Sequence, residues 1–265
     1  MRRTTMTWRQ IVPTLVTLAA MMCGFFSILV TLESMDKINS GMYHRWAAQL
    51  IMLAMILDGL DGNLARRLKG CSDLGSELDT YVDMTAFGIA PAVLIYAVTL
   101  QNTLVWRVIM TTAVVLSGVL RLARFKAMDP DRGQRGFSGL PITACAAWVS
   151  ILVYISQSEP LNSLSLNQGG MALVFLLGVL LFIVLQVSNI RYPKPTTHAA
   201  IFVPGVLLVT FLFLPWNKLV VVSAWTILVL DLVYVIAGPF YMQRIAVKDR
   251  CANNMPMENC PSDPL

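Results

Sequence analysis

The sequence predicts an all-α integral membrane protein, a polytopic bundle of about eight spanning helices. Hydrophobic residues make up 56% of the chain and charged residues only 13%, which lies outside the range of soluble globular domains. The apolar residues form eight segments, each close to the roughly 20 residues that cross about 30 Å of hydrocarbon. Lysines and arginines gather at alternate ends of these segments, as the positive-inside rule requires.

Each predicted span lies between charged or polar residues that mark its ends. In chain order the spans cover 11–32, 43–65, 78–100, 104–125, 138–156, 171–188, 199–216 and 218–241. The first ends before Glu33, the second ends before Arg66, and a polar connection around Gln101 separates the third from the fourth. A polar loop without Lys or Arg, 157–170, follows the fifth span, and Pro215-Trp216-Asn217 predicts a tight turn before the eighth.

Both ends of the chain are predicted to lie outside the bundle. Residues 1–10 contain Trp8 and three arginines, and we expect them to form a short interfacial segment at headgroup level. Residues 245–265 are polar and contain three prolines, and they are predicted to form a disordered cytoplasmic tail.

The basic residues also predict the orientation. With an even number of spans and a cytoplasmic N-terminus, 16 of the 20 lysines and arginines fall inside, and those outside are Lys37, Arg45, Arg107 and Lys218. This bias predicts an N-in, C-in protein of the cytoplasmic membrane, with its cytoplasmic face carrying the polar motif described next. The basic residues behind the net charge of +5 are spread over loop ends. This distribution favours a role as topology signals and in binding anionic lipid headgroups over a role in binding nucleic acid.

Four aspartates in a fixed pattern lie where the second and third predicted spans meet. The chain reads Asp58-Gly-Leu-Asp61-Gly62-Asn-Leu-Ala65-Arg66, then eight residues, then Gly75-x-x-x-Asp79-x-x-x-Asp83. A charged side chain at mid-bilayer depth costs about 2.5–3.5 kcal/mol on insertion scales. Four carboxylates at the ends of apolar runs therefore indicate a polyvalent cation, a water-filled cavity, or both.

The spacing of the aspartates favours the cation. Asp58 and Asp61 are three residues apart and Asp79 and Asp83 four apart, so each pair lies on one face of a helix. Two such pairs facing each other supply an all-oxygen set of ligands, which suits magnesium, manganese or calcium.

Small residues and an arginine accompany the carboxylates. Gly62 and Gly75 let a bulky ligand approach the backbone closely, and Ala65 keeps the same wall low. Arg66, about one turn beyond Asp61, supplies a forked cation suited to a phosphate. Together these residues predict a site for a diphosphate-bearing ligand held through a divalent ion; for the glycines alone, helix packing is an equally good explanation.

This pattern resembles the signature of the CDP-alcohol phosphotransferase family at every fixed position, including the eight-residue gap. The resemblance implies a membrane enzyme, usually a homodimer built on a six-helix core, that moves a phosphatidyl or similar group from a CDP-linked lipid to an alcohol and releases CMP. It implies Mg²⁺ or Mn²⁺ as the cofactor. It also implies a catalytic membrane domain at 11–193, followed by two additional C-terminal spans at 194–244.

The resemblance also implies roles for individual residues. Asp58, Asp61 and Asp79 would hold the metal, and Asp83 would be the general base on the attacking hydroxyl while also touching a second metal. The residues implied for the nucleotide and phosphates of the CDP-lipid are Gly62, Ala65, Arg66, Gly75 and Thr17. The chemistry agrees, because displacement at phosphorus needs charge neutralisation by a divalent ion and a base within reach of the acceptor hydroxyl.

Further stretches resemble the bacterial phosphatidylserine synthase branch of this family; they cover 83–92, 121–125, 137–141 and 187–193. This implies transfer from CDP-diacylglycerol to the hydroxyl of L-serine. Serine carries a carboxylate, an ammonium group and a hydroxyl, so its pocket needs a guanidinium and hydrogen-bonding groups. The candidates for serine or a lipid phosphate are Arg121, Arg124, Ser138, Gly139 and Arg191.

Two alternatives remain open from the sequence. The acceptor could instead be glycerol 3-phosphate, inositol phosphate or choline, or the lipid could be an archaeal diether, as in an archaetidylserine synthase. A more distant alternative is a divalent-cation transporter that uses the four aspartates as an intramembrane ion site. The arginine and the small-residue wall favour the enzyme, because a cation path gains nothing from a nucleotide-sized recess.

Overall fold

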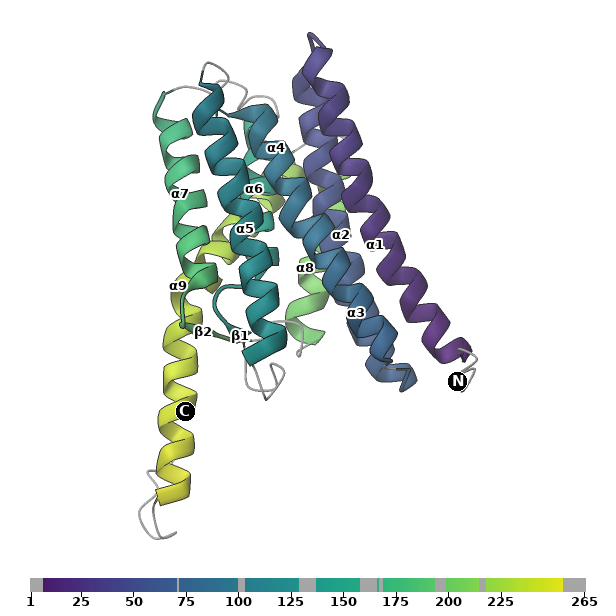
Figure 1. Ribbon diagram of the computed structural model, residues 1–265, viewed down its shortest axis with the longest axis vertical. Coiled ribbons are helices and arrows are strands. Elements are labelled where there is room, and N and C mark those ends of the chain that lie inside the picture. The colour runs from purple at the N-terminus through teal and green to yellow at the C-terminus, as the bar shows by residue number, and fades with distance from the viewer. Residues whose placement is uncertain are drawn as a thin grey trace.

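A computed structural model describes residues 7–70, 72–99, 103–128, 137–157, 166, 169–193, 199–214 and 218–254. Over these residues the protein is a bundle of helices with one two-stranded ribbon (Figure 1). A helical segment lies at each of the eight predicted spans, so the all-α membrane architecture is confirmed.

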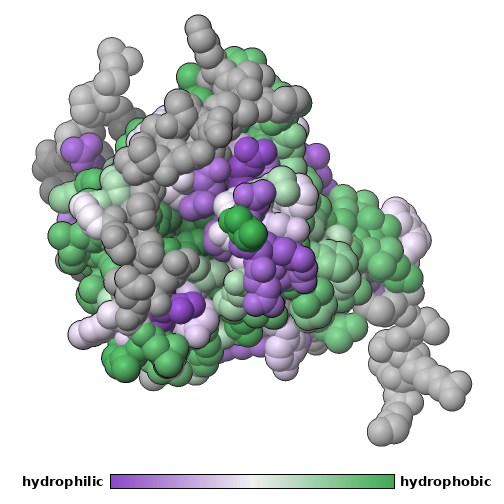
Figure 2. All heavy atoms as spheres, turned by 90° about the horizontal axis from the view of Figure 1, so that it is seen from above, coloured by the Kyte–Doolittle hydropathy of each residue, from purple (hydrophilic) through white to green (hydrophobic). Residues whose placement is uncertain are grey.

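Six of the described helices are long and apolar enough to cross a membrane: Trp8–Asp36, Ser40–Leu68, Leu74–Val98, Leu104–Ala127, Gly169–Val187 and Leu219–Arg244. A seventh apolar helix, Ile142–Ser156, has 15 residues and is shorter than the roughly 20 needed for a span. Viewed from one end, the molecule shows hydrophilic side chains gathered over that end and hydrophobic ones around its flanks (Figure 2). This distribution is what a lipid environment requires of a bundle.

The first two helices pack along each other and bring the end of α2 back to the start of α1. Helix α1 (Trp8–Glu33) is followed by a 3₁₀ turn, η1 (Ser34–Asp36), and by α2 (Ser40–Leu68). Helix α2 ends because Lys69 adopts a left-handed conformation with φ of 51°, and the Gly70 N–H donates to the Ala65 carbonyl oxygen at 2.9 Å. A Cβ atom at Gly70 would overlap the Arg9 backbone. The glycine therefore allows the end of α2 to lie against the start of α1.

The third predicted span, 78–100, is helical but is not one regular α-helix. It consists of α3 (Asp73–Val82), a π-helical segment η2 (Asp83–Ile89) and α4 (Ala90–Val98). Pro91 explains the wider turn, because proline donates no hydrogen bond and its ring clashes with the carbonyl four residues earlier in an α-helix. Asp83 is the first residue of this π-helical segment.

One helix of the second half of the bundle is buried between that half and α2. Helix α6 (Ile142–Ser156) is buried along almost its whole length, and α5 (Leu104–Met128), α7 (Gly169–Val187) and α9 (Lys218–Asn254) complete this half. Strands β1 (Phe137–Ser138) and β2 (Arg191–Tyr192) pair antiparallel, with Phe137 opposite Tyr192. The sequence predicted Ser138 and Gly139 inside the fifth span; the structure places them before it, because Ser138 pairs with Arg191.

The last two helices lie beyond this ribbon. Helix α8 (Ala199–Phe211) contacts α2 and α9, and the turn predicted at 215–217 lies outside the described residues. Helix α9 continues to Asn254, whereas the sequence predicted a disordered tail from 245; residues 255–265 and 1–6 lie outside the described residues. The start of α1 and the end of α9 lie at the same end of the bundle (Figure 1).

Candidate active site

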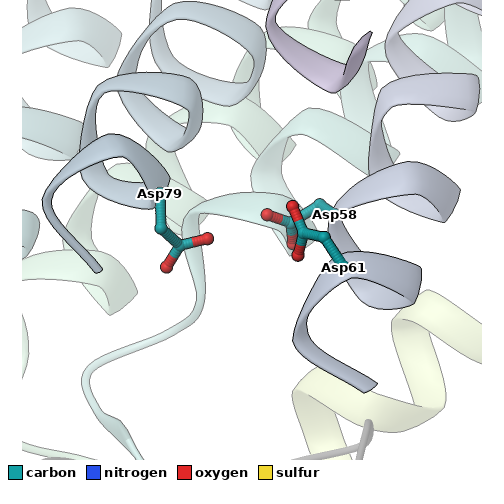
Figure 3. A group of neighbouring side chains, drawn as sticks. All are labelled: Asp58, Asp61 and Asp79. Carbon is teal, nitrogen blue, oxygen red and sulfur yellow. The ribbon is translucent and has the colours of Figure 1, made fainter. Parts of the chain in front are cut away.

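Three of the four predicted carboxylates converge between α2 and α3. Asp58 and Asp61 extend from α2, and Asp79 points toward them from α3 (Figure 3). Each offers an oxygen that lies within 4.8 Å of the oxygens of the other two. Ligand oxygens lie about 2.0–2.6 Å from magnesium or calcium, so oxygens of one coordination shell are about 3–5 Å apart. The three side chains therefore form a cluster able to hold a divalent metal ion.

Asp83 lies beside this cluster without belonging to the set of three. It interacts electrostatically with Asp79, Asp61 and Asp58, and also with the guanidinium of Arg121. Arg121 comes from α5 and is only 6% exposed. Asp83 thus interacts both with the carboxylate cluster and with a buried guanidinium.

The buried end of the cluster fits a cation. Asp61 is 5% exposed, and its Oδ2 atom has no hydrogen-bond partner among the residues that the structure describes. Thr17 lies against this carboxylate, and its hydroxyl also donates to the Pro13 carbonyl oxygen at 3.0 Å. A buried carboxylate oxygen without a protein donor is costly unless a cation satisfies it. This oxygen, together with an all-oxygen set of ligands, fits a hard divalent ion.

The two motif glycines differ in their surroundings. A Cβ at Gly62 would meet the Arg66 guanidinium at 3.8 Å, an ordinary contact, so packing among the described residues does not require a glycine here. A Cβ at Gly75 would approach the Ser72 Oγ at 3.2 Å, and Ser72 caps α3 by accepting from the Gly75 N–H at 3.1 Å. Gly62 therefore borders the Arg66 side chain at an ordinary contact distance, while Gly75 lies in the capped first turn of α3.

Arg66, exposed in the last turn of α2, is held by Asn63, a residue that the sequence pattern did not mark. Asn63 donates to the Gly59 carbonyl oxygen at 2.8 Å, and its Oδ1 accepts from the Arg66 Nη2 at 2.9 Å. Arg66 itself is exposed, and Ala65 beside it is partly buried. The three-residue spacing of Asn63 and Arg66 on a helix was the available signal for this pair.

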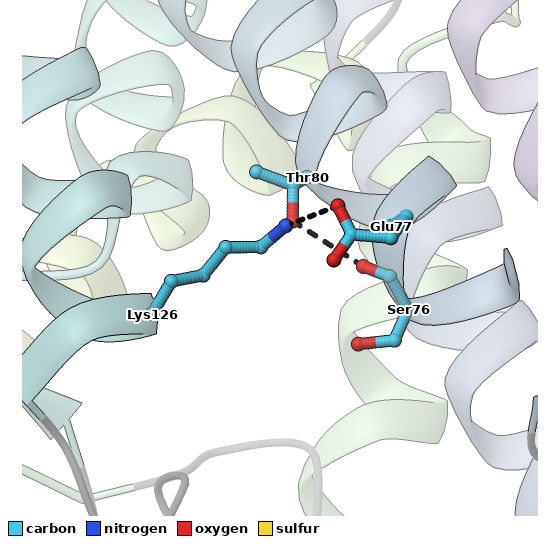
Figure 4. A network of polar contacts seen from close by, with 4 residues as sticks. All are labelled: Ser76, Glu77, Thr80 and Lys126. Carbon is cyan, nitrogen blue, oxygen red and sulfur yellow. Dashed lines mark hydrogen bonds and ion pairs between the residues drawn. The ribbon is translucent and has the colours of Figure 1, made fainter. Parts of the chain in front are cut away.

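An ion pair links α3 to α5 near the same end. The Lys126 Nζ lies 2.6 Å from the Glu77 Oε2, and the Thr80 hydroxyl donates to the Ser76 carbonyl oxygen one turn along α3 (Figure 4). In the sequence Lys126 was only a topology signal, because no local spacing connects it to Glu77. Through this pair the Lys126 ammonium group lies next to Glu77, which is within one helical turn of Asp79 along α3.

The other predicted acceptor residues surround the ribbon. Arg124 donates to the carbonyl oxygens of Val187 at 2.9 Å and Ser188 at 3.3 Å, to the Ser138 Oγ at 3.2 Å, and to the Asn189 Oδ1. Gly139 has a φ of +80°, and a Cβ atom at this position would overlap the Gln186 carbonyl oxygen. Arg191 is exposed on β2. In this structure Arg124 therefore links the end of α7 to β1, whereas Arg121 interacts electrostatically with Asp83.

Comparisons with known proteins point to one family. The family model described as CDP-alcohol phosphatidyltransferase matches residues 10–185. The chain is 35% identical over 148 residues to the CDP-diacylglycerol–serine O-phosphatidyltransferase of Helicobacter pylori strain 26695, covering 56% of this chain and 60% of that protein. It is 36% identical over 156 residues to the enzyme of that name from Methanocaldococcus jannaschii, covering 58% and 67%.

A match to a shorter relative covers more of both chains. The protein of the same name from Bacillus subtilis strain 168 is 30% identical over 191 residues, which is 71% of this chain and 93% of that protein. The similarity to the Helicobacter protein, in contrast, spans about 60% of its length. The family match includes the four aspartates and Arg121 and ends before β2, α8 and α9.

Proposed function

The chain belongs to the CDP-alcohol phosphatidyltransferase family, and on that premise we propose that it transfers a phosphatidyl group from CDP-diacylglycerol to the hydroxyl of L-serine. The products are phosphatidylserine and CMP. The observation that carries the proposal is the convergence of Asp58, Asp61 and Asp79, with ligand atoms within 4.8 Å of one another, inside the matched region. The choice of serine is supported by the names of the relatives from Helicobacter, Methanocaldococcus and Bacillus.

On the donor side, we propose that Asp58, Asp61 and Asp79 hold Mg²⁺ or Mn²⁺. The ion would neutralise charge on the diphosphate of the CDP-lipid. Asp83 is the candidate for contact with a second ion. Gly62 leaves space for the nucleotide, and Arg66 at the open end binds a phosphate oxygen through its guanidinium. Ala65, Gly75 and Thr17 complete this side, with Thr17 acting through its contact with Asp61.

On the acceptor side, we propose Asp83 as the general base. Its carboxylate accepts the proton of the serine hydroxyl as the hydroxyl oxygen bonds to the phosphorus of the phosphatidyl group. The bond from that phosphorus to the bridging diphosphate oxygen breaks, and CMP leaves with the electron pair. Arg121 is suited to the serine carboxylate because it is buried next to Asp83. Ser138, Gly139, Arg191 and Arg124 would lie at the edge of this pocket.

The proposed setting is a bundle of eight spans in the cytoplasmic membrane, N-in and C-in, with the site at the cytoplasmic face. The common end for α1 and α9 supports an even number of crossings. Arg66, Arg67 and Lys126 lie at the site end of the bundle, which supports a cytoplasmic orientation for that end. We propose a homodimer, as the family resemblance implies.

The test is a CMP-release assay on the purified full chain in detergent micelles. CDP-diacylglycerol is supplied with serine, with glycerol 3-phosphate, with inositol phosphate or with choline, each with and without Mg²⁺ or Mn²⁺, and the lipid product is identified by mass spectrometry. We expect turnover that requires both serine and a divalent ion, and none after Asp83→Asn. Turnover with another alcohol in place of serine would overturn the serine assignment and leave the reaction class intact.

A parallel measurement addresses the ion-transport alternative. Proteoliposomes without CDP-lipid are loaded with a metal-sensitive dye and given external Mn²⁺. The proposal predicts no flux above that of empty liposomes, because the Arg66 guanidinium, about one turn beyond Asp61 on α2, opposes the entry of a cation. Protein-dependent flux without CMP release would contradict the proposed enzyme.

A further inference from the structure

We propose that Glu77 and Lys126 are positioning residues of the carboxylate cluster. Their ion pair fixes how α3 is turned about its axis, and this rotation aims Asp79 at Asp58 and Asp61. The inference rests on the metal site of the proposed function, and it assigns a role to two residues outside the predicted set of ligands.

The ion pair joins two different helices. The Lys126 Nζ, from α5, lies 2.6 Å from the Glu77 Oε2 on α3 (Figure 4). Lys126 extends from an anchored part of α5, because Arg124, two residues earlier, donates to the Val187 carbonyl oxygen and to the Ser138 hydroxyl. The anchored partner is therefore α5, and the pair acts on the position of α3.

Helix α3 has little packing of its own that would fix its rotation. Among its described side chains only that of Val82, the last residue, is buried, and Leu74 and Tyr81 are 58% and 62% exposed. The helix packs mainly on α1 and on the contiguous η2. Since η2 is π-helical, the regular rotation of an α-helix is not carried over from the buried α4 into α3. The rotation of α3 therefore depends on side-chain contacts with its neighbours.

Glu77 and Asp79 point to opposite sides of α3. Residues two apart in an α-helix are separated by about 200° around its axis. With Glu77 held by Lys126, Asp79 is turned away from α5, and it points toward Asp58 and Asp61 on α2 (Figure 3). Three carboxylates with oxygens within 4.8 Å of one another repel each other until a cation binds. A contact on the far side of α3 that keeps Asp79 in this direction therefore favours metal binding.

The test measures Mn²⁺ binding to the full chain in detergent micelles by electron paramagnetic resonance, without either substrate. The variants are Glu77→Gln, Lys126→Gln and the double variant Glu77→Lys with Lys126→Glu, which reverses the pair. We expect the Kd for Mn²⁺ to rise about two- to fivefold in each single variant, the scale of one exposed ion pair. The double variant should return the Kd toward the wild-type value, because it restores the pair and keeps the net charge.

The two single variants separate positioning from a direct effect of charge on the ion. Acting through space alone, loss of the negative Glu77 would weaken Mn²⁺ binding, and loss of the positive Lys126 would strengthen it. Positioning instead predicts weaker binding in both variants. The sign of the change in Lys126→Gln is therefore the decisive reading.

A second ion pair among the described residues provides the matched control. The Lys37 Nζ lies 3.0 Å from the Glu33 Oε1 where α1 ends, and these side chains are 46% and 60% exposed, close to the 38% and 60% of Lys126 and Glu77. Glu33→Gln and Lys37→Gln should leave the Kd for Mn²⁺ unchanged. In EDTA the Tm of every variant should stay near the wild-type value, because an exposed ion pair adds little to stability.

Opposite changes in Kd in the two single variants would overturn the inference, as would an unchanged Kd in both or a double variant that binds as weakly as the single ones. An unchanged Kd together with a raised KM for CDP-diacylglycerol in Lys126→Gln alone would identify Lys126 as a substrate ligand instead. A wild type without saturable Mn²⁺ binding would overturn the proposed metal site as well, so the two failures are distinguishable.

Discussion

Gly24 on α1 lies directly against Ala86 on η2, and a Cβ atom at Gly24 would come within 2.6 Å of the Ala86 Cα. This contact joins the first helix to the π-helical segment three residues beyond Asp83. The glycine is buried, and its neighbour is backbone, which cannot move aside as a flexible side chain can. Gly24 is therefore a packing glycine, in contrast to Gly62, where a Cβ would make only an ordinary contact with the Arg66 side chain.

The first prediction follows from that contrast. Gly24→Ala should destabilise the protein by about 1–3 kcal/mol, the usual cost of overpacking a tight core. Gly62→Ala should leave stability within about 1 kcal/mol of the wild type, because alanine is favoured over glycine in a helix and the new Cβ meets no close neighbour. The measurement is the Tm of each variant in the same detergent.

The effects of the same two variants on substrate binding should be the reverse of their effects on stability. Gly62→Ala should raise KM for CDP-diacylglycerol, since the added methyl group would occupy the space proposed for the nucleotide. Gly24→Ala, assayed well below its Tm, should keep the wild-type KM for that substrate. A Gly62→Ala variant with lowered stability and unchanged KM would instead identify Gly62 as a packing residue.

The second prediction concerns metal and stability. Divalent ions should raise the Tm of the wild type, and binding at a hundred times Kd corresponds to about 2.7 kcal/mol. Asp61→Asn should abolish this rise because it removes one of the three converging carboxylates. In EDTA the same variant should be at least as stable as the wild type, since it no longer places a third negative charge beside Asp58 and Asp79.

Asp36→Asn is the matched control for this measurement. Asp36 is exposed in η1, at the far end of α1 from Thr17 and the carboxylate cluster. Its metal-induced rise in Tm should equal that of the wild type. An undiminished rise in Asp61→Asn would show that the ion binds elsewhere.

The third prediction distinguishes the two arginines of α5. Arg124→Ala should lower the free energy of unfolding by about 2–4 kcal/mol, because it leaves the Val187 and Ser188 carbonyl oxygens and the Ser138 hydroxyl without their donor. Acceptor KM should change little in the protein that remains folded. Arg121→Lys, in contrast, should raise acceptor KM while the charge near Asp83 is kept.

The measurements are urea unfolding and CMP release on the same preparation of each variant. An Arg124→Ala variant with wild-type stability and a raised KM for serine would restore Arg124 as a substrate ligand. That was its role in the sequence-based prediction.

The fourth prediction tests the phosphate end of the site. Arg66→Ala should raise KM for CDP-diacylglycerol about tenfold or more, the scale of losing a charge-assisted hydrogen bond to phosphate. Asn63→Ala should show a smaller change in the same direction, since it only removes the acceptor that holds Arg66 at 2.9 Å. Arg67→Ala, an exposed neighbour in the same helix turn, is the control and should leave this KM unchanged.

The sequence predicted those features that depend on local spacing. Asp58 and Asp61 share a face of α2, and Asp79 lies within α3, so a helical reading was sufficient to predict that these side chains meet. Their convergence is confirmed. The eight helical segments also follow from apolar runs of sufficient length, which is a property of composition within one segment.

Features that depend on distant partners could not be predicted in this way. Phe137 pairs with Tyr192 through two-residue strands too short to leave an alternating pattern. Tyr234 meets Tyr192 and the Pro193 carbonyl oxygen only because α9 packs on that ribbon, and nothing within α9 itself marks the residue. The interaction of Asp83 with Arg121 is a similar case, since Arg121 comes from a helix whose position relative to η2 is set by packing.

The wide turn at Asp83–Ile89 has a consequence for how this helix tolerates change. An inserted residue in an α-helix rotates everything after it by about 100°, and the π-helical segment absorbs one such residue where the two halves join. The half that carries the carboxylates and the buried half that follows Pro91 can therefore each keep its own rotational position about the helix axis. A residue inserted instead between Asp79 and this segment, in regular α-helix, would keep the helix apolar and long enough for the bilayer, yet rotate Asp79 by about 100° relative to the buried half. The proposed chemistry therefore depends on the rotational position of this one helix about its axis.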